Sequence, residues 1–464
     1  MIIVLRLYIC LGLFLGVPPI HAAQAQVEPT PTDRAAVHRA MVNLTLNATS
    51  GATLPLVFTP NVFDHLWQAW DHRKIADLRI ASLSQREKRK LVFDHYGLLE
   101  NPNNPLLPLG FVTRNGFLSM NCLACHSGSI LGQNIIGLPN RNIDLNALFN
   151  DLAKLHPIPG LFLTQLAFNF GPERGLVVSP GIESTALNLR DLNMNLKVLP
   201  NNLGRFQNSV VNAPAWWNIE FKTHIFADAV LPITPRVFVP NMTTILDSGP
   251  AFKSAESSVS DAFVLAKSTK PPKFPGKIDS VKAQNGKAVF ETNCAKCHGQ
   301  YEIDGKILDY PNKIVRINIV ETDPERAFPS DSLASYAGLL NFLKLSWIGE
   351  DFKSKIPKLS GYIAPPLLGI WATAPYLHNG SVPTLWELLN SAKRPKIWRA
   401  SESSSDYDLE KVGIKYQELK INSEPTNSHV YDTSKKGRGS YGHRFPDKLT
   451  QSEKIEVLEF LKCL

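Results

Sequence analysis

The stretch GKAVFETNCAKCHG occupies residues 286–299 and ends in the motif Cys294-Ala-Lys-Cys297-His298. Two thiols at this spacing can each form a thioether with one vinyl group of a single haem, and the histidine that follows then lies beneath the iron as its proximal ligand. A second copy of the motif, Cys122-Leu-Ala-Cys125-His126, lies far upstream. The sequence therefore predicts two covalently bound haem c groups, attached at these four cysteines and ligated by His126 and His298.

Paired cysteines also occur in zinc ribbons and in thioredoxin-like redox motifs. A zinc ribbon also contains two CxxC pairs, but they are normally about fifteen to twenty residues apart. Here the pairs are far more widely separated, and each has its own adjacent histidine. A thioredoxin-like CxxC is expected near a βαβ pattern in a cytosolic protein, and neither pair has that context. The agreement between two complete motifs favours haem attachment.

The start of the chain predicts export. Arg6 is the only charge in an apolar run from Ile2 to Val17, and two prolines and the small-residue segment Ala23-Gln24-Ala25 follow. This pattern is typical of a cleaved secretory signal peptide, here residues 1–25. Its apolar core is shorter than the roughly twenty residues that span a bilayer. We therefore expect a periplasmic or secreted protein without stable membrane insertion.

Composition fits a globular protein of two or three domains, because 44% of the 464 residues are hydrophobic and 19% are charged. The 34 prolines predict long irregular connections, since proline cannot donate to a sheet ladder. The formal charge of +8 is spread along the chain, which predicts a solvated surface and no nucleic-acid partner. A weak preference for acidic partners or anionic surfaces stays open. Cys10 leaves with the signal, so Cys463 is a lone thiol that cannot form an internal disulfide.

A polar segment divides the chain. Residues 254–282 contain a polar run followed by Lys-Pro-Pro-Lys-Phe-Pro, which predicts an extended tether. The tether would separate an N-terminal haem c domain, residues 26–253, from a C-terminal cytochrome c domain, residues 283–464.

Two capping boxes predict helix starts. Ser84-Gln-Arg-Glu87 predicts a helix from Gln85 to Tyr96, with Gly97 placed to end it. Thr450-Gln-Ser-Glu453 predicts a terminal helix. A further helix is expected over residues 145–155. The apolar spacing predicts that the following residues of the terminal helix face inward: Ile455, Val457, Leu458 and Leu461. In small c-type cytochrome folds such a helix packs across the helix that leads into the haem motif, and Phe290 and Leu458 are the expected partners.

A dense aromatic cluster lies between the two motifs, comprising Trp216, Trp217, Phe221, His224 and Phe226. Two interpretations stay open: ordinary core packing, or a wall of a haem pocket that bridges the haems for electron transfer. Within the cluster, Glu220 is a candidate proton donor for O–O cleavage, with a surface carboxylate as the alternative. His224 is a candidate distal ligand, because no histidine closely follows His126.

Residues 362–385 read YIAPPLLGIWATAPYLHNGSVPTL. This run resembles the segment of bacterial di-haem cytochrome c peroxidases in which a TAPYxHxGS-like sequence follows the second haem. Together with Thr322-Asp-Pro-Glu-Arg326 and Gly442-His443, it is similar above all to the rubber-oxygenase-like branch of that superfamily. The resemblance covers both haem domains.

The resemblance implies a mostly α fold of two cytochrome c-like haem domains with long irregular loops. The N-terminal haem would be the reactive centre, and the C-terminal haem would relay electrons from a small donor protein, a cytochrome or a cupredoxin. In the peroxidases a tryptophan lies between the haems, and a calcium ion sits at the domain boundary. Trp217 or Trp216 would fill the first role here.

The iron ligands depart from the peroxidase pattern. The second haem of the peroxidases is often ligated by methionine, but Ala392 stands at the matching position and residues 276–464 contain no methionine. After the first motif the next histidine is His156, well beyond the usual spacing. This leaves His378, His429 and His443 as candidates for the sixth ligand of the second haem.

We expect His443 to be that ligand. Gly442 lets the backbone approach a flat ring, and the capped terminal helix follows closely. In the peroxidases the histidine corresponding to His378 lies beside the haems, and His429 lies next to a polar stretch. The alternative is that His443 is a loop histidine that hydrogen-bonds a haem propionate.

Three functions stay open at this point. The first is an oxidoreductase in which the N-terminal haem reduces a peroxide or activates dioxygen with electrons relayed by the other haem. The second is an oxygenase that acts on a hydrophobic substrate, which an apolar channel beside the first haem would favour. The third is an electron carrier with two six-coordinate irons and no substrate.

Overall fold

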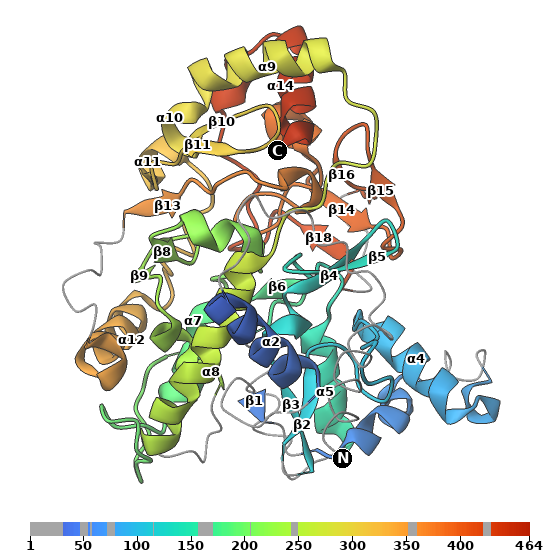
Figure 1. Cartoon of the computed structure of the whole chain (residues 1–464), viewed down its shortest axis with the longest axis vertical. Coiled ribbons are helices and arrows are strands. Elements are labelled where there is room, and N and C mark those ends of the chain that lie inside the picture. Colours follow the sequence, from blue (N-terminus) through green and yellow to red (C-terminus); the bar gives the residue numbers. More distant parts are fainter. Residues whose placement is uncertain are drawn as a thin grey trace, which may run out of the picture.

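The computed structural model describes residues 31–46, 54–55, 58–71, 79–114, 116–155, 170–204, 206–242, 249–350, 360–420 and 428–464. The predicted signal peptide and His156 lie outside these ranges. Figure 1 places the N-terminal helices and strands in the lower part of the molecule and the elements around the terminal helix in the upper part.

The helices are mostly short and are joined by long connections (Figure 1). The α-helices of the described residues are α2 (Pro31–Thr45), α4 (Gln85–Tyr96), α5 (Leu145–Leu155), α7 (Ser179–Leu187), α8 (Gly249–Ser268), α9 (Ser280–Asn293), α10 (Ala295–His298), α11 (Ile317–Val320), α12 (Leu333–Leu345), α13 (Leu385–Leu389) and α14 (Gln451–Cys463). The 3-10 helices are η1 (Pro60–Asp64), η2 (Leu66–Ala69), η3 (Ile80–Ser82), η4 (Cys122–Ala124), η5 (Trp216–Phe221), η6 (Pro235–Met242), η7 (Trp347–Gly349), η8 (Ile370–Ala372), η9 (Ser391–Lys393) and η10 (Phe445–Lys448).

Small antiparallel sheets form much of the rest. The three-stranded sheets are β1 (Leu54–Pro55), β3 (Phe117–Met120) and β2 (Phe111–Arg114), and β17 (Tyr416–Glu418), β14 (Ile397–Ala400) and β18 (Val430–Asp432). The two-stranded pairs are β4 (Ser127–Ile130) with β5 (Gln133–Ile136), β6 (Leu176–Val177) with β7 (Val211–Asn212), β8 (His224–Ile225) with β9 (Leu231–Pro232), β10 (Gln300–Tyr301) with β11 (Ile307–Asp309), β12 (Ile314–Arg316) with β13 (Gly361–Ile363), and β15 (Tyr407–Asp408) with β16 (Gly413–Ile414).

The prediction of a mostly α fold is wrong. The structure is 42% helical and 15% strand, a mixed α and β architecture. The strands are two to four residues long, which is too short for an alternating pattern of apolar residues to be recognised in the sequence. The proline content predicted long irregular connections. These connections instead contain short antiparallel β ladders.

Helices α9 and α14 pack across each other at the top of Figure 1, as the sequence predicted. Gly286 lies at their closest approach, where a Cβ atom would fall 1.9 Å from the carbonyl oxygen of Glu456. Phe290 and Leu458 belong to the same buried core, although the ring against Phe290 is Phe460, with 5.3 Å between centroids. The crossing fixes the helix that leads into the motif at Cys294.

Both capping boxes form as predicted. The hydroxyl of Ser84 accepts from the backbone N–H of Glu87, and the Glu87 carboxylate accepts from the Ser84 backbone. Gly97 ends α4 in the left-handed conformation. The Thr450 box opens α14 in the same way. The inward residues Val457, Leu458 and Leu461 are buried, but Ile455 is 38% exposed, so its prediction was wrong.

The extended tether predicted over residues 254–282 is largely a helix instead. Helix α8 covers its first half and also includes the boundary predicted at residue 253. One face of α8 is buried at helical spacing, namely Phe252, Ala255, Val259, Ala262, Leu265 and Ala266, and it packs against α2 and η6. A bidentate ion pair between Arg39 of α2 and Asp261 supports this packing. Serines and charged residues on the opposite face made the segment resemble a polar linker.

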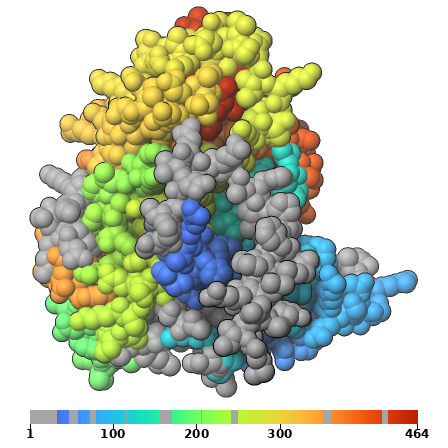
Figure 2. All heavy atoms as spheres, viewed as in Figure 1, coloured from blue at the N-terminus to red at the C-terminus, as the bar shows by residue number. Residues whose placement is uncertain are grey.

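The core joins residues from both haem-motif regions. One buried cluster contains Ile130, Leu138 and Trp217 together with Phe290 and Trp371. In the space-filling view, the regions that precede and follow α8 are in contact over one face of the molecule (Figure 2). Among the residues that the structure describes, no helix is long and apolar enough to cross a membrane.

Candidate haem sites

Both CxxCH motifs fold into the same single turn. The backbone N–H of His126 donates to the Cys122 carbonyl at 2.9 Å, and that of His298 donates to the Cys294 carbonyl at 3.1 Å. Cys122, Cys125, Cys294 and Cys297 form no disulfide among the described residues. The turn brings two thiols and one imidazole together in each motif, which is the donor set that covalent haem attachment uses.

Each motif histidine forms the same kind of hydrogen bond, between its ring Nδ1 and a proline carbonyl oxygen. Nδ1 of His126 lies 3.0 Å from the carbonyl oxygen of Pro214, and Nδ1 of His298 lies 2.9 Å from that of Pro365. A carbonyl oxygen can only accept, so Nδ1 carries the proton and Nε2 is the free ligand atom in both rings. This second bond fixes the orientation of a metal-binding imidazole and raises its basicity.

Burial keeps these imidazoles neutral. It lowers the pKa of His126 to about 4, with the Pro214 hydrogen bond acting in the opposite direction. Burial also lowers the pKa of His298. Neutral imidazole is the form that ligates a metal, so both rings fit the role that their motifs predict.

His443 faces the motif histidine of the second site. The ring centroids of His298 and His443 are 6.1 Å apart, with 68° between the ring planes. Nδ1 of His443 is buried and has no hydrogen-bond partner among the described residues. Burial, with His298 and Arg394 as further causes, lowers the pKa of His443 to about 3. The ring is therefore a neutral nitrogen donor.

Arg394 fixes the loop that carries His443, and sequence reasoning missed this residue. Its guanidinium donates to the carbonyl oxygens of Ser440 at 2.6 Å, Gly442 at 2.7 Å and His443 at 3.3 Å. Two further bonds join it to α13, through the carbonyl oxygens of Glu387 and Leu388. No local sequence motif predicts the role of Arg394, because all of its hydrogen-bond acceptors are backbone carbonyl oxygens.

Gly442 makes a close backbone contact that the sequence did not predict. It has a φ of +75°, and a Cβ atom there would lie 2.2 Å from the carbonyl carbon of Glu321. Its approach to a haem ring stays a prediction. The backbone N–H of His443 completes the contact by donating to the Val320 carbonyl at 2.6 Å.

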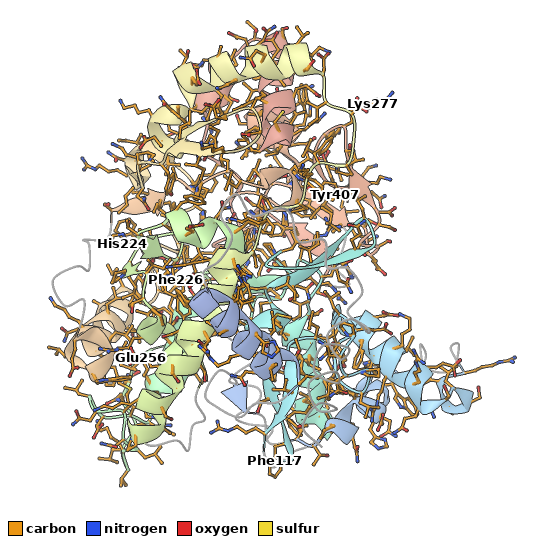
Figure 3. All side chains as sticks on the ribbon, in the orientation of Figure 1. Phe117, His224, Phe226, Glu256, Lys277 and Tyr407 are labelled. Atoms are coloured by element: carbon orange, nitrogen blue, oxygen red, sulfur yellow. The ribbon has the colours of Figure 1, made fainter. Side chains whose placement is uncertain are left out.

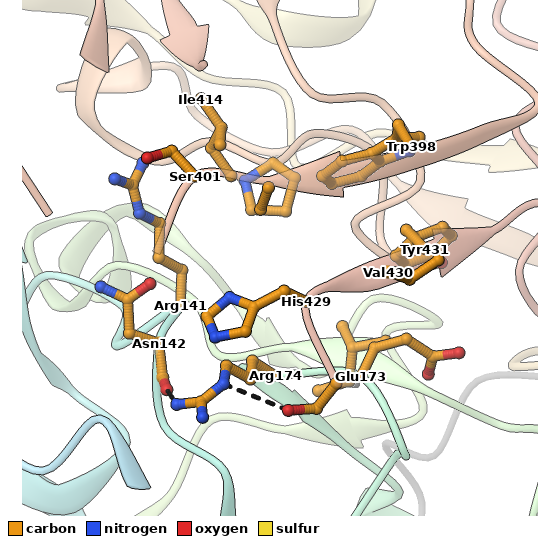
Figure 4. Close-up of a pocket in the computed structure, with 14 residues that line it drawn as sticks. Arg141, Asn142, Glu173, Arg174, Trp398, Ser401, Ile414, His429, Val430 and Tyr431 are labelled. Atoms are coloured by element: carbon orange, nitrogen blue, oxygen red, sulfur yellow. Dashed lines mark hydrogen bonds between the residues drawn. The ribbon is translucent and has the colours of Figure 1, made fainter. Parts of the chain in front are cut away.

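The other two histidines of this region lie elsewhere. His378 stacks on Tyr362 with 4.1 Å between centroids, and burial, with Arg326 as a second cause, lowers its pKa to about 3. His429 lines a small cavity together with Arg174 (Figure 4). The structure thus brings His443, rather than either of these residues, to His298.

The Thr322 to Arg326 stretch is buried except for Pro324, and its contacts anchor this region. Arg326 forms an ion pair with Asp228 at 3.1 Å, and Tyr336 donates its hydroxyl to the same carboxylate. The carbonyl oxygen of Asp323 accepts from the Tyr362 hydroxyl at 2.6 Å. The Thr322 to Arg326 stretch and the run at residues 362–385 therefore contact each other in one buried network. This network supports the structure around His298.

The adjacent tryptophans contact different sites. Trp216 stacks on His126, with 5.3 Å between centroids and 28° between the planes. Trp217 is buried in the core that contains Phe290, and its Nε1 donates to the Leu368 carbonyl at 2.7 Å. The two side chains thereby join the His126 motif to the segment after the second motif.

Neither Glu220 nor His224 has a contact with His126 among the described residues. Glu220 is exposed on η5, as expected of a surface carboxylate. His224 lies on β8 at the left edge of Figure 3, where its Nδ1 is 2.9 Å from the Thr223 hydroxyl. β4, which begins directly after His126, lies near the centre of Figure 1. The ligand role of His224 stays a prediction.

No cluster of three or more His, Cys, Asp or Glu side chains suited to a metal ion occurs among the described residues. The expected calcium ion therefore stays a prediction.

One segment of the chain matches a known protein family. Residues 361–399 match the family described as RoxA-like, cytochrome c-like. This part of the chain is related to the RoxA-like c-type cytochromes. The matched segment contains Pro365, Leu368 and Arg394, whose contacts reach His298, Trp217 and His443 respectively. The match supports a relationship to c-type cytochromes, which implies haem c, whereas the number of haems and the wider peroxidase superfamily stay predictions.

Two proteins of Sinorhizobium fredii are also similar. The uncharacterized protein y4iM is 32% identical over 198 residues, which are 37% of this chain and 43% of y4iM. The uncharacterized protein y4iJ is 28% identical over 257 residues, 42% of this chain and 41% of y4iJ. The chain thus spans less than half the length of these relatives.

Proposed function

We propose that this chain is an exported di-haem c-type cytochrome, in which the His298 haem relays electrons and the His126 haem reduces a peroxide or activates dioxygen. When bound, a haem supplies one-electron chemistry and, where a coordination position is open, a place for an oxygen species to bind. The observation that carries the proposal is the difference between the two motif histidines. Among the described residues, His298 faces a second imidazole and His126 does not.

The second site has the donors of a relay haem. Two imidazoles that ligate one metal ion from opposite sides have ring centroids about 6 Å apart, because each metal–nitrogen bond is about 2 Å long and each centroid lies about 1 Å beyond its nitrogen. The 6.1 Å between His298 and His443 agrees with this separation. Two strong ligands keep the geometry almost unchanged when an electron is gained or lost. Arg394 supports this role by holding the His443 loop rigid.

The first site lacks an equivalent pair in the described part of the chain. The ring stacked near His126 is Trp216, and no second histidine ring lies within stacking distance there. An iron ligated by His126 would thus have its other side free for a small oxidant, or filled by a group from farther away. This asymmetry favours reaction at the N-terminal site.

The tandem tryptophans would connect the two sites. Trp216 contacts His126, and its neighbour Trp217 contacts Leu368, three residues after Pro365. Because Pro365 holds His298, a short path of packed side chains and hydrogen bonds links the two motif histidines. An electron that enters at the His298 haem would follow this path toward His126.

Carbon monoxide and hydrogen peroxide, added to the reduced protein, test the proposal. We expect carbon monoxide to shift the visible spectrum of half of the haem and peroxide to reoxidise both haems. A spectrum that responds to neither reagent would identify an electron carrier with two filled iron sites instead.

A second candidate function is oxygenation of a hydrophobic substrate, which the RoxA-like relationship and one structural observation favour. Leu123 of the first motif is buried in an apolar cluster with Ala40, Leu44, Leu109 and Leu265, and Cys122 packs against it. Dioxygen uptake that depends on an added hydrocarbon substrate, and not on an electron donor, would select this function.

A further inference from the structure

A small cavity lies at the seam between two distant parts of the chain. Its volume is about 40 Å³. One side is lined by residues 141–142, 173–174 and 176, and the other by residues 398, 400–401 and 428–431. Figure 4 shows Arg141 along one side of the cavity, reaching toward Ser401, with Arg174 and His429 below. A space of this size holds a carboxylate group or one or two water molecules.

The Arg141 guanidinium is partly buried and forms no ion pair with another described residue. Its Nη2 is buried and has no hydrogen-bond partner among the described residues. Its guanidinium lies over the ring of Tyr407, 5.4 Å from the centroid, but the Tyr407 hydroxyl donates to the Trp371 carbonyl. Tyr376, the other tyrosine nearby, donates to the Ile370 carbonyl at 3.1 Å. Neither hydroxyl neutralises the charge.

Two acidic side chains beside the cavity, Glu173 and Asp144, are already paired with other residues. Glu173 bonds to Arg438 at 3.3 Å. Asp144 lies 3.7 Å from Arg174 and accepts from the Ser428 hydroxyl. Arg174 in turn donates to the carbonyl oxygens of Asn142 and His95.

Three buried arginines of this chain have a carboxylate partner. Arg89 pairs with Asp64, Arg326 with Asp228, and Arg438 with Glu173. A buried charge is retained only where it is paired and hydrogen-bonded. Arg141 has no such partner among the described residues, and an anion from outside the polypeptide would supply one.

The loop that carries Arg141 is fixed to the first haem motif. The backbone N–H of Asn140 donates to the Cys125 carbonyl at 2.8 Å, and the Asn140 side chain donates to the Ala124 carbonyl at 3.2 Å. Arg141 therefore has a defined position relative to Cys125 and His126. A carboxylate belonging to a group attached there would lie on the same loop.

We propose that Arg141 binds a carboxylate at this seam, supplied either by a propionate of the haem at Cys122 and Cys125 or by a small free carboxylate. The planar guanidinium matches a carboxylate through two parallel hydrogen bonds. The propionate source rests on the proposed function, whereas the free carboxylate does not. In both cases the bound anion ties residues 139–142 to the C-terminal strands β14 and β18.

The experiment compares Arg141→Gln and Arg141→Lys with Arg86→Gln, a control on the exposed face of α4. Haem content is measured first by pyridine haemochrome, which tests the proposed function separately. The midpoint potential of each haem and the melting temperature are then recorded in sodium chloride and in sodium acetate of equal ionic strength.

A propionate partner predicts that Arg141→Gln lowers the potential of one haem regardless of acetate, because loss of the cation disfavours electron uptake. Arg141→Lys should restore part of the shift. A free carboxylate predicts that acetate raises the melting temperature of the wild-type protein and not that of Arg141→Gln. Should Arg141→Gln fail to fold, Arg141→Lys and the acetate titration of the wild type give the same readouts. The proposal is overturned if the Arg141 variants match Arg86→Gln in potential and acetate has no effect on the wild type.

Discussion

The rings of His298 and His443 lie 6.1 Å apart between centroids, although one follows α9 and the other precedes α14. The crossing of these two helices brings the residues at their ends together. Gly286 permits that crossing, since any larger residue there would clash with Glu456. The position of His443 thus depends on helix packing together with the loop contacts of Gly442 and Arg394.

Replacing His443 tests its ligand role. His443→Ala should convert one of the two irons from low-spin to high-spin, because the second strong ligand is lost. Electron paramagnetic resonance and the visible spectrum report this change, and added imidazole should restore the low-spin signal. His429→Ala is the matched control, since His429 lies in a different cavity. A fully low-spin spectrum for His443→Ala would remove His443 from the iron.

Arg394 should act through His443. Arg394→Gln loses hydrogen bonds to five carbonyl oxygens of two segments, and we expect it to destabilise the protein by at least about 2 kcal/mol. The iron at His298 should also gain a temperature-dependent high-spin fraction. Arg394→Lys should rescue part of both effects, and Arg444→Gln, an exposed neighbour, should show neither. If the spin state is unchanged while stability falls, Arg394 has only a structural role.

Trp217 should support electron transfer between the sites. Trp217→Phe keeps the apolar ring but loses the hydrogen bond to Leu368, so stability should fall by about 1 kcal/mol. We also expect slower electron transfer between the haems, measured by stopped-flow reduction. Trp398→Phe is the control, because that indole is equally buried and donates to the Ser381 carbonyl. Equal transfer rates in the two variants would leave Trp217 as a packing residue.

Acid should destabilise the protein through His378. Burial lowers the pKa of native His378 to about 3, whereas the unfolded value is about 6.5. Unfolded chains therefore bind a proton that the native state does not, so this contribution is complete above pH 6.5 and is lost as the pH falls toward 3. By pH 4 the loss is about 3 kcal/mol. Denaturation of His378→Gln should show a flatter profile over this range, with the exposed His38→Gln as control. Superimposable profiles for His378→Gln and the wild type would refute the assignment.

Local chemistry made part of this structure predictable. The capping boxes at Ser84 and Thr450 depend on residues three apart, and both form. Elimination among three histidines indicated His443, because methionine is absent from that region. Each of these predictions rests on residue types whose chemistry has few alternatives.

Contacts between distant backbone atoms were not predictable. The carbonyl oxygens of Pro214 and Pro365 orient His126 and His298, and a backbone acceptor can belong to any residue type. Both prolines follow an alanine, a shared signal that the sequence does contain. Helix α8 was missed because its exposed serines outweighed a buried face at helical spacing, and short strands such as β6 and β7 have too few residues for any pattern.

The central claim is that both motif turns hold a haem. The most direct measurement is the ratio of haem to protein, from pyridine haemochrome absorbance and intact mass after acid-acetone extraction. The account predicts two haems per chain that remain attached to the protein, and one in a Cys297→Ala variant that loses attachment at its own site alone. A ratio of one in the wild type, or colour that passes into the solvent, would contradict it.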